Sequence, residues 1–459
     1  MKRILCISVL LLAAADLASQ NPIVPPGVYI ADPSAHVWAD GKMFVYGSRD
    51  ESPEYYCSKS YRVLSSDDLK SWKMSGESFA TTGPGDQVTY SDNYLYAPDV
   101  QYYKGKYYLY YCLSFAKNTE GVAVSDSPLG PFKNGTPIDV GGFNQIDPCV
   151  FIDDDGKAYY VWGQFSAKMA RMNPDMMSID TATIRENVIT EEEHFFHEGC
   201  YMIKRNGLYY LVYADVSRGG APTCLGYSVS INPMGPYTYK GVIIDNRFCD
   251  PNVWNNHGSI VEFRGKWYVF YHRATNGSVA MRKACLEPIS FRADGTIPEV
   301  VMTSQGAGDP LDAFSETDAA RACLLFGNVR IQTLGDGNEV IGRIWTKDKA
   351  AYRYLDFGNG ADSLSIRLKA GSKSFRINVS AGSAWTGSLG SIDIPPQVSD
   401  EWITVTMPVK PVKGIHTLWF AFTDPSVKGS YMIPSEYGNS RQQTLCTIDS
   451  FRFTGPDNE

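Results

Sequence analysis

The amino-acid sequence predicts an all-β protein, a five-bladed β-propeller followed by a β-sandwich (jelly roll). The first observation is a short turn of a polar residue, a glycine and an aromatic pair that recurs five times in the first 272 residues. The second is a change, after about residue 312, to short segments in which apolar and polar residues alternate. The third is an aromatic content of 13 %, which is typical of strand-rich proteins and of sugar binders.

The N-terminus has the pattern of a cleaved secretory signal peptide over residues 1–20. Lys2 and Arg3 precede an apolar stretch over residues 4–15, and small residues follow. We therefore expect a secreted or periplasmic protein. No later apolar run reaches about 18 residues, so no membrane span is expected. The net charge of −8, without a long basic run, argues against nucleic acid as a partner.

The recurring turn predicts the propeller over residues 21–305. Its five glycines are separated by 51 to 64 residues, and each is expected at the positive φ of a hairpin turn; they are Gly41, Gly105, Gly156, Gly207 and Gly265. A strand–turn–strand repeat near 50 residues is typical of one four-stranded blade. Five unrelated hairpins are the alternative, but matching segments at 125–132 (SDSPLGPF) and 230–237 (SINPMGPY) favour true repeats.

The residue at the start of each repeat differs while the turn stays the same. Nine positions before the first four glycines lie Asp32, Tyr96, Asp147 and Glu198, and His257 lies eight before the fifth. Because the inner strands of a propeller run along one axis, these residues are expected to meet at one point. Three carboxylates brought together raise the pKa of at least one of them. An acid beside an ionised base is what cleavage of a glycosidic bond requires.

Other acidic and histidine residues have simpler interpretations. The alternative for the three acids above is capping or turn chemistry at strand starts. Asp99 lies three residues past the equivalent position and is interpreted as structural. In the segment HFFHE, His194 and His197 would point to opposite faces of a strand, so no zinc site is expected there. Disulfide pairing and oligomeric state stay open.

The propeller segment resembles glycoside hydrolase family 43. The resemblance rests on YIADPSAHVWADGKMFVYGSRDE, YAPDVQYYKGKYYLYYC, IDPCVFIDDDGKAYYVWG, FFHEGCYMIKRNGLYYLVYA and ISFRADGTIPEV, which occur in that order. It implies an inverting enzyme that releases terminal sugars from plant polysaccharides. It also implies that Asp32 is the general base, that Glu198 is the general acid, and that Asp147 orients the acid and raises its pKa. No cofactor is required, although His257 is a possible axial calcium or water site; a hydrogen-bonded core histidine is the alternative.

The resemblance narrows the substrate without fixing it. The first-blade segment, together with an appended module, looks most like an α-L-arabinofuranosidase, and β-xylosidase and exo-galactosidase activities occur on the same scaffold. A catalytically silent sugar-binding propeller and a protein-binding propeller are the alternatives from other classes. Tyr96, Phe196 and Arg282 are candidate sugar contacts. Inversion requires the carboxyls of Asp32 and Glu198 to lie about 6.5–9.5 Å apart.

The segment over residues 312–459 is predicted to be the β-sandwich, and residues 312–455 resemble carbohydrate-binding module family 6. The resemblance implies sugar stacking on exposed aromatic rings, here Tyr352 and Trp402, with Trp345 and Trp385 as rivals. A module that only braces the propeller is the alternative. Any structural calcium in this part would involve Glu316 and Asp449.

Overall fold

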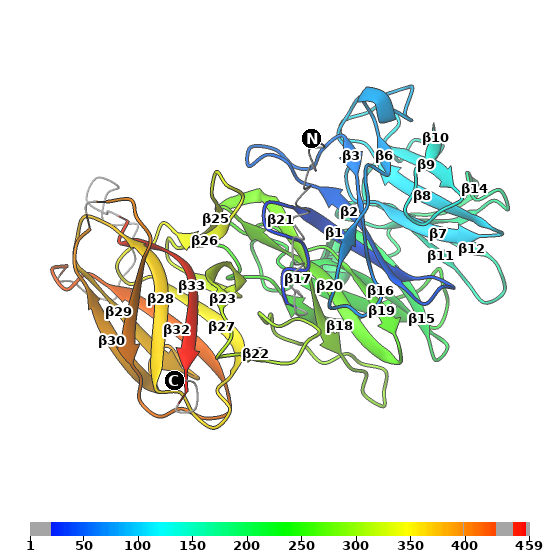
Figure 1. Ribbon diagram of the computed structural model, residues 1–459. Coiled ribbons are helices and arrows are strands. Elements are labelled where there is room, and N and C mark those ends of the chain that lie inside the picture. Colours follow the sequence, from blue (N-terminus) through cyan, green and yellow to red (C-terminus); the bar gives the residue numbers. More distant parts are fainter. Residues whose placement is uncertain (1–19, 398, 428–443, 456–459) are drawn as a thin grey trace, which may run out of the picture.

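The computed structural model describes residues 20–397, 399–427 and 444–455 (Figure 1). The signal peptide expected over residues 1–20 lies outside this part of the chain, apart from its last residue. Among the described residues, no helix combines the length and the apolar character that a bilayer crossing needs. Apart from one short α-helix and two 3₁₀ turns, every regular element of the described residues is a strand, so the prediction of an all-β protein is confirmed.

Five small antiparallel sheets make up the N-terminal part. The first has the order β1 (Ile30–Val37), β2 (Met43–Arg49), β4 (Val63–Ser66), β5 (Lys73–Met74). The second contains β7 (Asp99–Tyr103), β8 (Lys106–Cys112), β9 (Glu120–Ser125) and β10 (Lys133–Pro137). The third contains β11 (Cys149–Ile152), β12 (Ala158–Trp162), β13 (Lys168–Met172) and β14 (Ile179–Arg185). The fourth contains β15 (Phe196–Arg205), β16 (Leu208–Asp215), β17 (Cys224–Ser230) and β18 (Thr238–Asp245).

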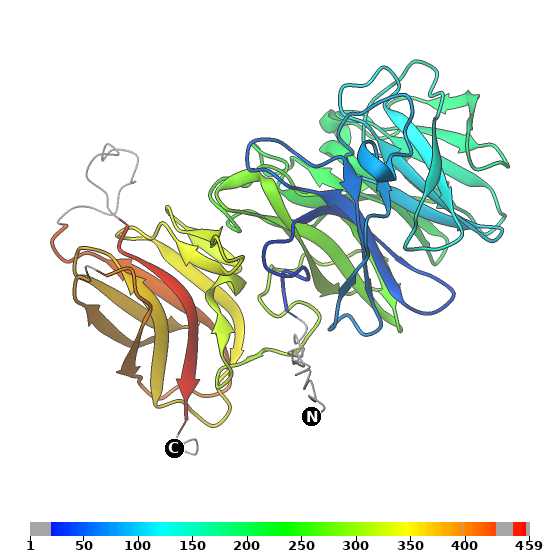
Figure 2. The same cartoon turned by 45° about the horizontal axis from the view of Figure 1, so that its top comes forward.

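The fifth sheet closes the ring. It contains β19 (Ser259–Phe263), β20 (Lys266–Thr275) and β21 (Ser278–Ile289). The segment around Ile23 lies along β21, because Ile23 donates its N–H to the carbonyl of Ala284 at 2.9 Å. The inner strands contact one another in a cycle, β1 with β7, β7 with β11, β11 with β15, β15 with β19 and β19 with β1. This cycle is the five-bladed propeller that the repeats predict (Figure 2).

The five turn glycines all have the backbone conformation that the sequence predicts. Their φ angles lie between 72° and 89°. In the hairpin between β7 and β8, Lys104 precedes Gly105 with φ 46°, so both central residues lie in the left-handed region, as a type I′ turn requires. This turn matches the twist of the flanking strands and fixes their register. Short elements fill the connections: β3 (Ser60–Tyr61) pairs with β6 (Phe79–Ala80), and η1 (Gly83–Gly85) and α1 (Glu191–His194) are single turns.

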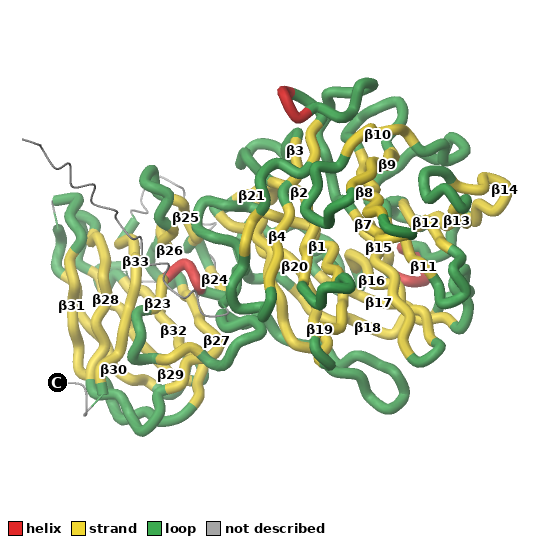
Figure 3. The backbone as a smooth tube through the Cα atoms, turned by 45° about the vertical axis from the view of Figure 1, so that its right-hand side comes forward, coloured by secondary structure: helices red, strands yellow, loops and turns green. Residues whose placement is uncertain are grey.

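Two six-stranded sheets form the C-terminal sandwich (Figure 3). One contains β22 (Leu311–Asp312), β27 (Lys349–Asp356), β32 (Ile415–Thr423), β29 (Phe375–Ala381) and β30 (Ser388–Ile394), with β24 (Leu324–Phe326) beside β27. The other contains β25 (Arg330–Thr333), β26 (Glu339–Gly342), β33 (Cys446–Thr454), β28 (Ser363–Ala370) and β31 (Ile403–Pro408), with β23 (Thr317–Asp318) beside β33. The single turn η2 (Ala319–Arg321) follows β23. Alternating residues of both sheets meet in one buried core.

The sandwich lies directly against the propeller. Lys283 on β21 forms a buried ion pair with Glu339 on β26 at 2.5 Å. The N–H of Leu325 donates to the carbonyl of Phe248 at 2.7 Å. Cys323 belongs to the same buried apolar cluster as residues of the fourth and fifth blades. All nine described cysteines are free thiols and buried, so packing and ion pairs hold the two parts together.

Candidate active site

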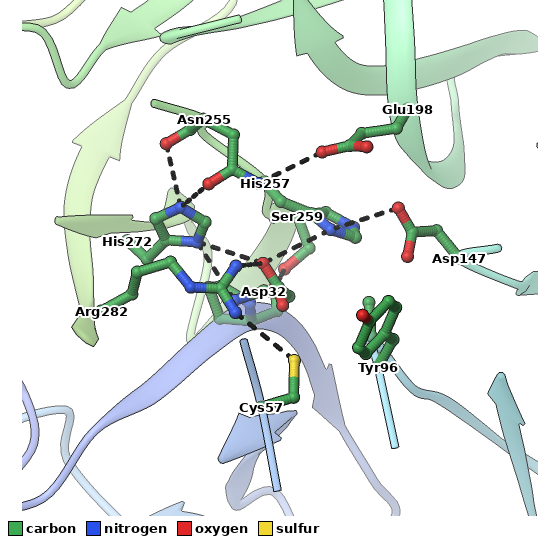
Figure 4. A network of polar contacts seen from close by, with 12 residues as sticks. Asp32, Cys57, Tyr96, Asp147, Glu198, Asn255, His257, Ser259, His272 and Arg282 are labelled. Carbon is green, nitrogen blue, oxygen red and sulfur yellow. Dashed lines mark hydrogen bonds and ion pairs between the residues drawn. The ribbon is translucent and has the colours of Figure 1, made fainter. Parts of the chain in front are cut away.

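One cavity of about 200 Å³ lies at the propeller axis, at the ends where the inner strands begin. The five residues that head the repeats all line it: Asp32, Tyr96, Asp147, Glu198 and His257 (Figure 4). Residues separated by up to 225 positions are thereby brought to one point, as the phase of the repeats predicts. The cavity is small compared with typical pockets for drug-sized ligands, which span about 300–1,000 Å³.

Backbone irregularities aim two of the acids at the axis. The register of β1 shifts between Ala31 and Ser34, and Asp32 in this bulge has φ 52°. Asp147 has φ 60°, just before β11. A bulge redirects a side chain out of the regular alternation of a strand. Such left-handed conformations are uncommon for residues other than glycine, and they persist where the surrounding structure holds them.

A buried guanidinium controls Asp32. Nη1 of Arg282 lies 2.8 Å from Oδ1 of Asp32, while Nε and Nη2 of the same side chain hold Asp50 at 2.9 Å each. Burial alone would raise the pKa of the Asp32 carboxyl. The positive charge of Arg282 outweighs burial and holds the pKa well below its usual range. Asp32 is therefore an ionised carboxylate throughout the ordinary pH range.

A chain of hydrogen bonds connects Asp32 with Glu198. The backbone N–H of Asp32 donates to Nδ1 of His272 at 3.2 Å. This bond assigns the ring proton of His272 to Nε2, which donates to the backbone carbonyl of Asn255 at 3.0 Å. Nδ2 of Asn255 in turn donates to Oε1 of Glu198 at 3.1 Å. The other oxygen of Glu198 accepts a bond of 2.8 Å from Nε2 of Gln164, so two amides fix the orientation of this carboxyl.

Asp147 is buried, and among the described residues it forms no ion pair with a lysine or an arginine. Its backbone N–H donates to Sγ of Cys112 at 3.2 Å. Burial, followed by the negative charges of Glu198 and Asp32, raises the pKa of Asp147 well above its usual range. Behind it, burial raises the pKa of Glu120 to about 8. The group of acids consequently retains at least one proton at neutral pH, which agrees with the expectation that clustering raises at least one pKa.

His257 lies between two of the acids. Its Nδ1 is 3.7 Å from Oδ1 of Asp32 and 3.9 Å from Oδ2 of Asp147. Burial lowers the pKa of His257, against the opposing charges of Asp32 and Glu198, so the ring is neutral at pH 7. Gly199 packs against it, since a Cβ at this glycine would lie 2.8 Å from the ring.

Neither expected calcium site finds a fitting set of ligands. Nowhere in the described part of the chain do three His, Cys, Asp or Glu side chains gather in a way that would hold a metal ion. In the sandwich, Glu316 accepts a hydrogen bond from Ser450, and Asp449 is held by Asn338 and Arg367. These two carboxylates of the sandwich already have protein partners.

Two predicted sugar contacts are corrected by the structure. Phe196 is fully buried and packs edge-on against Tyr213 in the core instead of lining the cavity. The neighbouring His197 lines it in its place. Tyr352 is likewise fully buried, with its hydroxyl donating to the carbonyl of Ala319, so it is a core residue of the sandwich.

The remaining candidates divide between the cavity and the sandwich surface. Arg282 lines the cavity, but its guanidinium is engaged by two aspartates, which makes it a positioning residue for Asp32. The ring of Trp402 is covered by the cationic groups of Arg367 and Lys369 at 5.1 and 5.0 Å. Trp385, one of its rivals, is 70 % exposed; the other, Trp345, is partly buried.

Asp99 is structural, as expected. Its Oδ1 accepts from Ser34 at 2.6 Å and contacts Nε2 of His36 at 2.8 Å, while Oδ2 accepts from the N–H of Val150 at 2.8 Å. It thus links the inner strands of the first three blades beneath the cavity.

Sequence reasoning missed several residues of the site. Tyr56, Cys57, Gln164, Trp254 and Asn255 also line the cavity. Trp254 and Asn255 stand three and two positions before His257, so the position of His257 was a usable signal for both. The remaining three come from connections between strands, which differ from one repeat to the next, so the repeat does not predict where their side chains lie.

Comparison with known proteins agrees with this geometry. The model of glycosyl hydrolases family 43 matches residues 19–297. A xylosidase/arabinosidase of Thermoclostridium stercorarium is 32 % identical over 477 residues, which cover 88 % of this chain and 95 % of that protein. A xylosidase/arabinosidase of Bacteroides ovatus is 31 % identical over 61 % of this chain and 98 % of its own.

Two solved structures share the fold. One is a family 43 β-xylosidase/α-arabinofuranosidase from a compost microbial metagenome, in complex with xylotriose and in a calcium-free form. It is 31 % identical, covers 62 % of this chain and 98 % of its own, and has a TM-score of 0.52. The other, an arabinoxylan arabinofuranohydrolase of Bacillus subtilis, covers 95 % of this chain and 99 % of its own at 24 % identity and a TM-score of 0.54. Its likeness therefore extends over both the propeller and the sandwich.

Proposed function

Because the chain belongs to glycosyl hydrolases family 43, and is thus an inverting hydrolase of O-glycosidic bonds, we propose that it releases terminal α-L-arabinofuranosyl units from plant polysaccharide. The observation that carries the proposal is the meeting of Asp32, Asp147 and Glu198 in one cavity. An ionised carboxylate and a proton-holding carboxyl across a sugar-sized space are the groups that inverting hydrolysis requires.

In the proposed reaction Asp32 is the general base. Its carboxylate accepts a proton from a water molecule, and the oxygen of that water forms a bond with the anomeric carbon. The bond from this carbon to the leaving oxygen breaks at the same time, and Glu198 transfers its proton to that oxygen. Asp147 keeps a proton within the group of acids, while Asn255 and Gln164 hold the orientation of the Glu198 carboxyl. The product has the opposite anomeric configuration, and we expect the Asp32 and Glu198 carboxyls to lie about 6.5–9.5 Å apart.

The size of the cavity supports an exo mode of attack. A space of about 200 Å³ suits one terminal sugar and leaves the rest of the chain outside. Tyr56, Tyr96 and Trp254 supply aromatic surface at its wall, of which Trp254 is 48 % exposed. Aromatic faces of this kind pack well against the apolar faces of sugar rings.

β-Xylosidase activity is the second candidate. The relatives from Thermoclostridium stercorarium and Bacteroides ovatus carry the double name xylosidase/arabinosidase, and one from Xylanibacter ruminicola is named β-xylosidase. An arabinofuranose and a xylopyranose present similar hydroxyls near the scissile bond, so one cavity can accept both. We also propose, from residues 1–20, that the enzyme acts outside the cytoplasm.

The test is hydrolysis of the 4-nitrophenyl glycosides of α-L-arabinofuranose, β-D-xylopyranose and β-D-galactopyranose. We expect the largest kcat/KM for the arabinofuranoside, with NMR showing inversion in the first-formed sugar. A larger kcat/KM for the xyloside would select the second candidate, and binding without turnover of any substrate would make the propeller a silent sugar binder.

Two variants test the assigned roles. Glu198→Ala should abolish the rate on substrates with poor leaving groups and reduce it less on nitrophenyl substrates, which leave without a proton. Asp32→Ala should abolish both, because attack by water is needed in every case. Equal sensitivity of the two variants to the leaving group would refute the assignment.

A further inference from the structure

A second groove, of about 560 Å³, crosses the junction between the propeller and the sandwich. We call it the junction groove. It is formed on one side by the loop after β18 and on the other by the end of β24, and its lining includes Arg218, Arg247, Phe248, Val253 and Phe326. Figure 3 places β24 on the side of the sandwich that faces the propeller.

Aromatic rings from the propeller and from the sandwich lie next to one another in a row along this groove. Phe248, from the propeller, lies 4.8 Å from Phe326, measured between ring centroids, and remains 47 % exposed. Phe326 lies 6.0 Å from Trp419 on β32, with the two rings inclined by 30°. Neighbours of Trp419 along its strand point into the core, so Trp419 belongs to the outer face of its sheet. The result is a strip of apolar ring surface that starts on the propeller and ends on the sandwich.

The junction groove and the catalytic cavity are connected by one short loop. Val253 lines the groove, and the next residue, Trp254, lines the cavity. Phe248 and Trp254 are six residues apart, so their Cα atoms are separated by at most about 20 Å. A ligand that extends out of the cavity past Trp254 therefore reaches Phe248 within a few sugar units.

The charges beside the strip favour a neutral, hydroxyl-rich ligand. Arg218 is held by Asp245 at 2.8 Å and by Glu299 at 2.7 Å, which compensates its charge. Within the described part of the chain, the guanidinium of Arg247 makes one long bond of 3.5 Å, to the carbonyl of Gly219, which leaves donors for a ligand. A single spare guanidinium beside flat aromatic surface suits sugar hydroxyls better than a phosphate chain, which would need several uncompensated cations.

We propose that the junction groove binds the backbone of the polysaccharide, a chain of β-linked pyranose units, while its terminal or branching sugar occupies the catalytic cavity. Pyranose rings with equatorial hydroxyls have flat apolar faces that match the ring strip, and their edges carry the hydroxyls that Arg247 would bind. The inference rests on the proposed function for the nature of the chain, since that function places a plant polysaccharide at the cavity.

Packing between the two domains is the competing explanation for the rings. Other contacts already hold the junction, including the Lys283–Glu339 ion pair and the hydrogen bond from Leu325 to Phe248. A ring buried only for packing would also not leave nearly half of Phe248 exposed. Arg247 gives a test that is independent of packing, because its guanidinium forms no ion pair with any residue that the structure describes.

The experiment is calorimetric titration of the full chain with xylohexaose and xylobiose, in a Glu198→Gln background that prevents turnover. Phe326→Ala and Arg247→Ala should each weaken xylohexaose binding about 2- to 10-fold and leave xylobiose binding unchanged. Tyr102→Ala is the matched control, since this ring is 44 % exposed, lies near the end of β7 and lines neither the cavity nor the groove, so both affinities should stay unchanged. Melting temperatures of all variants are measured alongside.

Unchanged xylohexaose affinity in both groove variants would overturn the inference, and so would an equal loss in the Tyr102→Ala control. A lower melting temperature for Phe326→Ala, with full affinity in Arg247→Ala, would also overturn it and identify the rings as packing. Failure of the proposed function is distinguishable: it is absence of turnover on all nitrophenyl glycosides, whereas the titration reads binding alone.

Discussion

Replacement of Arg282 by methionine tests how the protein keeps its proposed base ionised. The guanidinium lies 2.8 Å from Asp32 and 2.9 Å from Asp50, and all three side chains are almost completely buried. Methionine fills a similar volume without charge. The substitution therefore leaves two buried carboxylates without their common cation, and burial, the largest influence on Asp32, then acts unopposed by Arg282.

Two magnitudes follow from this arrangement. Removing one partner of a buried ion pair typically costs about 3–5 kcal/mol of unfolding free energy. The pKa of Asp32, now well below its usual range, should rise above the ordinary aspartate value of about 3.9. Because a depressed pKa stabilises the folded state above the unfolded value and loses that effect as the pH falls, the wild type should also lose stability in strong acid.

The assay is the pH dependence of kcat/KM between pH 3 and pH 9. In the wild type, Asp32 stays ionised and contributes no acid limb. In Arg282→Met, an acid limb should appear above pH 4, below which kcat/KM falls about tenfold per pH unit. The double variant Arg282→Met/Asp50→Asn is the control, because it removes one of the two stranded charges and should recover part of the stability while keeping the new limb. An Arg282→Met enzyme that is folded and has an unchanged acid limb would refute the reasoning.

Three further predictions concern the groups around the site. Gly199→Ala forces a side chain to within 2.8 Å of the His257 ring at a φ of 72°, so chemical denaturation should show a loss of about 1–3 kcal/mol; an unchanged midpoint would contradict this packing. Asp147→Asn removes a buried carboxyl whose pKa is raised, so it should raise the unfolding free energy at pH 7 by about 0.5–2 kcal/mol while lowering kcat, and a destabilised variant would count against the charge argument. Burial raises the pKa of Glu120 to about 8, so the stability that its proton contributes is complete below pH 4 and is lost as the pH rises to 8. Glu120→Gln should therefore flatten the decline of the melting temperature over this pH range. An equally steep decline in the variant would contradict the argument.

The repeat pattern was sufficient to predict the propeller and most of its centre. Gly41 and its four counterparts mark the hairpin turns, and the residues nine positions earlier mark the axis. This prediction works because residues at equivalent positions in the five repeats lie at the same level along the propeller axis. Asp32, Asp147 and Glu198 could therefore be grouped before any coordinates were known.

The error at Phe196 has a local physical cause. Phe196 was proposed as a sugar contact because it stands beside Glu198 in the sequence, and on a regular strand residues 196 and 198 would point to the same side. The register of β15 shifts between these two residues, and the bulge turns Phe196 into the core while His197 reaches the cavity. A one-residue shift leaves no mark in composition or alternation, so the sequence alone did not reveal it.

Residues that act on the acids from other parts of the chain were harder still to predict. Arg282 was expected to touch sugar, and it instead joins Asp32 to Asp50 from the last strand of the fifth blade. Asn255 connects His272 with Glu198 through a loop. Arg282 lies on β21, away from the inner-strand starts that the repeat marks, so the repeat gave no reason to place it beside Asp32.

The arrangement of the inner strands also explains why the acids of the site reduce the stability of the propeller. Equal height around one axis places Asp147 near Glu198 and Asp32, and their charges together with burial raise its pKa. A propeller selected only for stability would place apolar residues at these strand starts. The closed ring of inner strands tolerates the acids because each blade is held by its own hydrogen-bonded sheet and by its neighbours. The unfavourable burial of charge is therefore confined to the axis, where the proposed reaction needs the acids.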